Sequence, residues 1–270
     1  MVLDSITGMA SNISPLMAMT GLLIGFILWI IFLSLISLVL FVISIFKHNI
    51  SFSHIFNKSF DSFKKFFTSK ILKRYIPVIL LGVFIFGTAY YMEFLEFSAS
   101  FIFIVIYYVI IIIYSIYYVF LDSSVAKSYF NYLDSEKFEF SWISLIQWLK
   151  LILIGLIYLI LYFLSLLFLG IPLIFLNYIL PFVRYPIIVE NSGIFQSIKK
   201  GIGILKKEFW NVVFFVGMYV LILSSLNLLV WWIPIINQLG KLFTYYVIQP
   251  FATMYFTEVY FEIENKYIRD

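Results

Sequence analysis

The dominant pattern in the chain is a series of long apolar runs separated by short segments that carry most of its charges. The runs cover about residues 16–46, 75–92, 98–121, 149–189, 209–233 and 240–261. A helix that crosses a bilayer needs roughly 20 apolar residues, and helices satisfy their own backbone hydrogen bonds in lipid. The pattern therefore predicts an all-α protein whose helices form a polytopic bundle in a membrane.

The fourth run, 149–189, is too long to cross a membrane once. At 1.5 Å per residue it makes about 60 Å of helix, roughly twice the hydrocarbon thickness. We expect a turn at Gly170 and Pro172, because glycine tolerates tight backbone geometry and proline lacks a helical N–H donor. Two crossings here bring the predicted total to about seven, and a single crossing brings it to six.

The distribution of Lys and Arg favours the larger total. With seven crossings and the N-terminus outside, every Lys and Arg except Lys241 lies on the cytoplasmic side. With a single crossing at 149–189, the basic residues are divided between the two sides. Cytoplasmic loops of membrane proteins are enriched in Lys and Arg. The sequence thus predicts a multi-pass protein of the cell membrane with an outside N-terminus and a cytoplasmic C-terminus.

Two basic segments between the runs, 49–67 and 187–210, have the pattern of amphipathic helices. In each segment five apolar residues share one helical face, and the lysines occupy the opposite side. The apolar residues are Phe52, Phe56, Phe60, Phe63 and Phe67 in the first segment and Ile194, Ile198, Ile202, Leu205 and Phe209 in the second. We call the two segments elbows, and expect them to lie in the membrane surface rather than form solvated loops.

The elbow lysines are predicted to contact anionic lipid head groups. They are Lys58, Lys64, Lys65, Lys199, Lys200, Lys206 and Lys207. The elbows match at an offset of 142 residues, and Asn49 falls on Asn191. Each elbow follows one span and precedes two more. This indicates a single transmembrane domain, 1–270, with repeat 1 at about 16–121, repeat 2 at about 172–262, and a linker plus an extra span at about 122–171.

Composition supports the membrane class and narrows the partners. The chain is 63% hydrophobic and 12% charged, with a mean hydropathy of +1.05. Its formal net charge of +4 does not indicate a nucleic-acid partner, because the lysines lie next to spans, where they orient the chain. A sequence without cysteine has no disulfide, thiolate metal site or cysteine nucleophile.

Candidate chemistry is sparse, because few ionisable residues fall in the predicted spans. Arg184 and Glu190 flank the end of the fifth span. We interpret them first as an ion pair that sets the angle of the second elbow. The alternative is that they form a ligand site. Glu258 and Glu262 lie at the inner end of the last span. They are interpreted either as residues of the membrane interface without a ligand or as ligands of a cation.

No known catalytic motif is present in the sequence. His48 and His54 lack a third ligand at metal-site spacing. Walker loops, zincin helices and nucleophile elbows are missing too. We therefore expect no catalytic residue, no metal and no cofactor.

A polar stripe marks the third span. Tyr107, Tyr114 and Tyr118 fall within an arc of about 40° of helix. Tyrosine hydroxyls need partners in lipid, so this face should meet other helices or a polar cavity. Asn177 lies mid-span and is the best candidate for a further interior polar contact, while Gln147 and Asn227 suit interhelical hydrogen bonds. The tyrosine stripe either packs against other helices or lines a path for a substrate.

The second half of the chain resembles a large superfamily of bacterial and archaeal membrane proteins. That group includes the membrane domain attached to some glycerophosphoryl diester phosphodiesterases and many members of unknown function. The matching residues are Gly170, Pro172, Pro181, Glu190, Gly193, Ile198, Lys199, Leu205 and Phe209. Gly201 stands where a serine is common. The resemblance covers about 149–230 and implies a membrane fold without catalytic residues, since the phosphodiesterase barrel is absent.

Three functional hypotheses follow from these patterns. The first is a non-enzymatic scaffold or accessory factor whose elbows bind anionic lipid, a membrane-protein partner or a second copy of the chain. The second is a transporter or channel for an apolar or lipid-like solute, lined by tyrosine and asparagine. The third, a lipid-modifying enzyme that uses Glu190 or the histidines, has the least support.

Overall fold

The computed structural model describes residues 15–94, 101–166, 168, 170–231 and 247–269. In these ranges the chain is helical and forms no β-strand, which confirms the predicted all-α bundle. A π-helical turn, Phe67–Ile71, joins the first elbow to the helix after it. The helices are α2 (Pro15–Lys47), α3 (Phe52–Phe66), α4 (Leu72–Phe94), α5 (Phe101–Ser135), α6 (Leu145–Leu166), α7 (Ile171–Glu190), α8 (Ile194–Lys207), α9 (Phe209–Trp231) and α11 (Gln249–Arg269).

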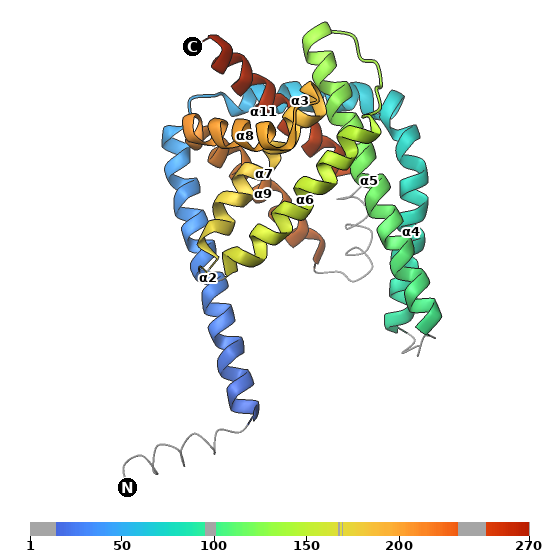
Figure 1. The fold of residues 1–270 in the computed structure, drawn as a ribbon, viewed down its shortest axis with the longest axis vertical. Coiled ribbons are helices and arrows are strands. Elements are labelled where there is room, and N and C mark those ends of the chain that lie inside the picture. Colours follow the sequence, from blue (N-terminus) through green and yellow to red (C-terminus); the bar gives the residue numbers. More distant parts are fainter. Residues whose placement is uncertain (1–14, 95–100, 167, 169, 232–246, 270) are drawn as a thin grey trace.

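The two elbows, α3 and α8, lie across the same end of the bundle, and the longer helices run away from them (Figure 1). Four described helices are long and apolar enough to cross a membrane: Leu23–Lys47, Ile104–Ser135, Leu145–Leu166 and Ile171–Glu190. A fifth is added if α8 and α9, which meet at 97°, count as one broken span. The chain is therefore a multi-pass membrane protein. Lys241 and part of the predicted last span lie outside the described residues.

The turn expected inside 149–189 is confirmed at Gly170. This residue has a φ of 69°, in the left-handed region that glycine adopts without strain. Pro172 lies in the first turn of α7, where a backbone N–H has no helical partner to lose. A Cβ on Gly170 would lie 2.6 Å from the Trp29 side chain, so the turn packs directly against α2.

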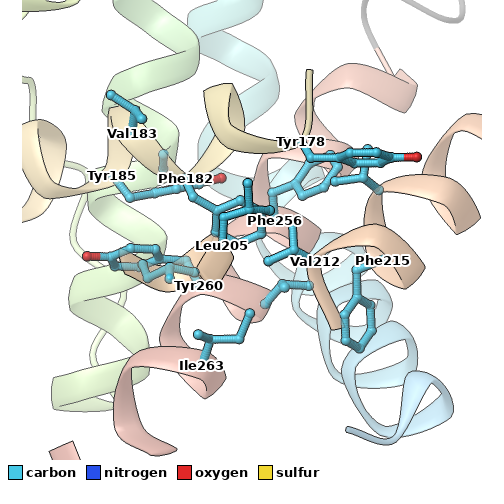
Figure 2. Close-up of a cluster of buried hydrophobic side chains, with 14 of the residues drawn as sticks. Tyr178, Phe182, Val183, Tyr185, Leu205, Val212, Phe215, Phe256, Tyr260 and Ile263 are labelled. Atoms are coloured by element: carbon cyan, nitrogen blue, oxygen red, sulfur yellow. The ribbon is translucent and has the colours of Figure 1, made fainter. Parts of the chain in front are cut away.

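Two clusters of buried apolar side chains join the helices. The larger one contains residues from both elbows and from α5, α6, α7, α9 and α11. Figure 2 shows part of it, including Leu205 of α8, Phe182 of α7 and Phe256 of α11. The smaller cluster lies between α4 and α5 and includes Met254 of α11. Because α11 contributes to both clusters, it packs as an internal helix of the bundle.

The end of α7 is capped by side chains from α6. The amide of Gln147 donates to the carbonyl oxygens of Ile187 and Ile188 at 2.9 Å each, and Lys150 donates to those of Asn191 and Ser192. The last carbonyls of a helix have no intrahelical donor and need such partners. This confirms the interhelical role expected for Gln147.

Replacing Gln147 by leucine should lower the free energy of unfolding by about 1–3 kcal/mol, because two buried carbonyls lose their donor. Thermal unfolding of the purified protein in detergent measures this loss. Ile146→Leu, next to Gln147 on the exposed side of α6, serves as the control and should leave the transition unchanged. An unchanged transition in Gln147→Leu would show that the cap is dispensable.

Candidate functional sites

The elbows pack on the bundle through small residues and large apolar residues in equal number. The buried residues are Ile55, Ser59, Ser62 and Phe66 in α3 and Ser197, Gly201, Ile204 and Leu205 in α8. The expectation that the phenylalanine stripe of the first elbow lies in the acyl region is wrong in part. Phe251 of α11 contacts the rings of Phe56 and Phe63, with centroids 5.5 and 5.7 Å apart. The stripe therefore packs against protein, while Phe60 stays half exposed.

Three of the four buried positions of each elbow correspond at the predicted offset of 142 residues. Ile55 and Ser59 of α3 match Ser197 and Gly201 of α8, and all four are buried. The same holds for Ser62 and Ile204, which match at this offset and are likewise buried in α3 and α8. Equivalent helices of a repeat must present the same face to the bundle. Phe66 and Leu205 break the pattern, because their equivalents Glu208 and Phe63 are only partly buried. The internal repeat stays a prediction.

Lys58 of the first elbow forms an ion pair with the protein. Its ammonium pairs with the carboxylate of Glu258 and lies 3.9 Å from that of Glu262, both on α11. Glu258 is fully buried and also accepts a 2.8 Å hydrogen bond from the hydroxyl of Tyr129. Glu258 is therefore buried between α3, α5 and α11 rather than exposed at the end of α11.

Lys200 occupies the same position in the second elbow and makes the same kind of contact. Its ammonium pairs with Glu190, at the end of α7, and with Glu264 of α11. The hydroxyl of Tyr260 lies 3.3 Å from Glu190. Burial raises the pKa of the Glu264 carboxyl, and the Lys200 ammonium opposes that rise. Two of the seven predicted lipid-binding lysines thus anchor the elbows to α11.

The remaining elbow lysines are exposed: Lys64, Lys65, Lys199, Lys206 and Lys207. On α8, Lys199 and Lys206 share one strip with the apolar residues Phe195 and Ile202. The prediction that all the lysines lie opposite the apolar face is therefore wrong for these two. These four side chains fall within an arc of about 60° and face away from the buried positions of α8. They line a mostly apolar groove of about 740 Å³. Gly193, the N-cap of α8, accepts the Ser197 hydroxyl on its carbonyl and donates its N–H to Gln196.

Arg184 forms a buried ion pair with Asp122 rather than with Glu190, the partner that the sequence predicted. Arg184 does not pair with Glu190, which Lys200 engages instead. Its Nη1 lies 3.3 Å from Oδ2 of Asp122 on α5, and its Nη2 lies 3.3 Å from the hydroxyl of Tyr185. The other oxygen of Asp122 accepts the hydroxyl of Thr253 on α11. The sequence pattern placed Asp122 in a loop, whereas α5 continues through it to Ser135.

A pocket of about 350 Å³ lies beside this ion pair, between α5, α6, α7, α9 and α11. Its polar lining residues are Tyr118, Asp122, Ser123, Arg184, Tyr219, Gln249 and Thr253. Most of the remaining lining is apolar, including Leu151, Ile154, Leu180 and Phe256. An apolar pocket with a few convergent polar groups is the usual form of a small-molecule site.

The predicted tyrosine stripe reaches this pocket at one residue. Tyr118 lines the pocket, and the ring of Tyr114 stacks on it with centroids 6.0 Å apart. Tyr107 donates instead to the carbonyl of Ile85 at 3.5 Å, which is a packing contact with α4. Asn177 is exposed and accepts the hydroxyl of Tyr158 on α6, so the interior position expected for it is wrong. The side chain of Asn227 lies outside the described residues.

In the described ranges, no group of three or more His, Cys, Asp or Glu is placed to hold a metal ion. Comparisons of the chain with known protein families, curated proteins and solved structures found no match. The resemblance to the phosphodiesterase-associated membrane domains therefore stays a prediction.

Proposed function

We propose that this multi-pass membrane protein is a non-enzymatic scaffold or accessory factor that contacts anionic lipid head groups through its elbows. The observation that carries the proposal is the strip of Phe195, Lys199, Ile202 and Lys206 on α8. Phe195 is 84% exposed and lies one turn before Lys199, and Ile202 is 38% exposed and lies between Lys199 and Lys206 along the helix. An aromatic or aliphatic anchor beside a lysine suits the boundary between acyl chains and phosphates.

The arrangement of the elbows extends this surface. α3 and α8 lie across the same end of the bundle (Figure 1), so Lys64 and Lys65 of α3 meet the same lipid layer as Lys199 and Lys206. Each lysine near an anionic membrane surface contributes about 1 kcal/mol of attraction. Several lysines at one end therefore favour retention of anionic lipid over zwitterionic lipid.

The double variant Lys199→Gln/Lys206→Gln tests the proposal. Losing about 2 kcal/mol of attraction should weaken the retention of phosphatidylglycerol about tenfold to thirtyfold. Native mass spectrometry of protein released from nanodiscs containing phosphatidylglycerol and phosphatidylcholine measures the bound lipid. The thermal transition should stay unchanged, because both side chains are exposed.

Two further variants act as controls for this experiment. Lys137→Gln removes an exposed lysine from the loop after α5 and should leave lipid retention unchanged. Lys200→Gln breaks the contacts with Glu190 and Glu264 and should lower thermal stability. Equal phosphatidylglycerol retention by the double variant and the unmodified protein would contradict the proposal.

A further inference from the structure

The pocket beside Arg184 has a polar end and an apolar end. Asp122, Arg184 and Thr253 form the polar end, where both oxygens of Asp122 already accept hydrogen bonds. Leu151 and Ile154 of α6 lie at the apolar end. The division matches an amphipathic ligand, whose polar group and hydrocarbon portion each need a matching surface.

The opening of the pocket faces the apolar outer surface of the protein. Two of its lining residues are exposed: Val119 of α5 at 43%, and Gly155 of α6. Next to Gly155, Leu156 and Leu159 are half exposed on a helix that qualifies as a membrane span. The opening between α5 and α6 therefore lies at hydrocarbon depth, and a ligand reaches it from the bilayer.

Arg184 has hydrogen-bonding capacity that its protein partners leave unused. Nη1 and Nη2 each donate once, while the buried Nε has no partner among the described residues. About a quarter of the Arg184 side-chain surface is accessible. A guanidinium presents five donors in a planar fork that matches carboxylate and phosphate oxygens. The polar group best suited to this end is thus an acceptor of that kind.

We propose that this pocket binds a single-chain lipid that enters sideways from the bilayer between α5 and α6. Its carboxylate or phosphate accepts hydrogen bonds from Arg184, and its chain extends past Gly155 into the membrane. A volume of about 350 Å³ holds a head group and the first part of one chain. The site lies inside the bundle, so it is distinct from the elbow surface and does not depend on the function proposed for it.

Photolabelling with a fatty acid that carries a diazirine in its chain tests the site. The full chain is reconstituted in phosphatidylcholine nanodiscs, irradiated with the probe, digested and analysed by mass spectrometry. Labelling should concentrate on peptides around Val119 and Gly155, relative to lipid-exposed peptides of α2. Equal labelling of α2 and of the α5–α6 opening would overturn the proposal.

A pair of glycine variants separates binding in the pocket from general lipid contact. A Cβ on Gly155 meets no atom within 4 Å, so Gly155→Leu fills the opening without displacing α6. It should reduce labelling at the opening about tenfold. Gly25→Leu on α2 has the same open surroundings and should change nothing. Unchanged labelling in Gly155→Leu would refute the site.

Competition identifies the head group that Arg184 accepts. An unlabelled fatty acid and a monoacyl lipid phosphate should both displace the probe, and the stronger competitor identifies the preferred acceptor. The corresponding fatty alcohol should compete at least about tenfold less well, because it offers no anionic oxygen to the guanidinium. Arg184→Lys keeps a positive charge beside Asp122 but loses the planar fork, and should reduce probe binding in a folded protein. Equal competition by the alcohol would exclude a role for Arg184 in binding.

Discussion

Replacing Arg184 by methionine is expected to lower the free energy of unfolding by about 3–5 kcal/mol. The variant leaves the carboxylate of Asp122, which is buried on α5, without its cationic partner. The hydroxyl of Thr253 remains as a donor, but a neutral hydrogen bond does not compensate a buried charge. Methionine fills much of the volume of the arginine side chain, so the loss reports mainly the broken ion pair.

A double-mutant cycle isolates that contribution. Asp122→Asn alone leaves Arg184 without its carboxylate and should also be destabilising. The double variant Asp122→Asn/Arg184→Met has no buried charge at this position, and should recover at least half of the loss. Unfolding by a mixed-detergent titration, followed by far-ultraviolet circular dichroism, gives the four free energies. Strictly additive losses would show that the two side chains do not interact in the folded protein.

Replacing Gly201 by alanine should lower the free energy of unfolding by about 1–3 kcal/mol, although alanine favours helix. A Cβ at this position would lie 2.5 Å from Cγ2 of Val183 and 3.3 Å from its Cα and N. Val183 is buried on α7, and its backbone atoms cannot move aside alone. The second elbow would have to shift away from the bundle.

Gly203 provides a matched control on the same helix. A Cβ at Gly203 meets no atom within 4 Å, so Gly203→Ala carries only the gain in helix propensity, about 0.5–1 kcal/mol. The two alanine variants should therefore change thermal stability in opposite directions in one detergent assay. A stabilised Gly201→Ala variant would mean that α8 is not held against α7 at this point.

Local sequence signals account for the helices and the turn between α6 and α7. The apolar runs predicted the long helices. Gly170 and Pro172 predicted the turn, because each residue restricts or permits backbone conformations at its own position. The length of α5 was missed because its apolar run stops at Asp122. That carboxylate is buried through Arg184 and Thr253, which follow it by 62 and 131 residues. A pairing over such a distance leaves no local pattern.

The elbow faces show a second limit of sequence patterns. Hydrophobic periodicity identified the phenylalanine and isoleucine stripes, but close packing against the bundle requires small residues such as Ser59 and Gly201. Lysine spacing does not distinguish a phosphate partner from a carboxylate partner either. Lys58 and Lys200 therefore looked like lipid ligands although both meet α11. The one pair of small residues at matching positions, Ser59 and Gly201, was the available signal for the packed face.

The buried carboxylate also alters one argument about transport. The predicted spans hold few ionisable residues, which gives an ion-coupled transporter little support from the sequence alone. Asp122 lies inside a helix that qualifies as a span and lines the pocket beside Arg184. Buried ionisable residues in membrane helices mark ion or substrate pathways in many proteins. The scarcity of ionisable residues in the predicted spans therefore no longer argues against a coupled transporter.

The position of α11 in the chain has a consequence for biosynthesis. Every element that α11 contacts precedes it, so Lys58, Lys200 and Asp122 are all inserted before their partners on α11 exist. During translation Lys58 has no carboxylate from α11 to meet, whereas Lys200 already has Glu190 of α7. Anionic lipid phosphates are the counter-ions at hand in the membrane surface at that stage. Lipid would thus be the temporary counter-ion of Lys58, and the synthesis of α11 would replace it with Glu258.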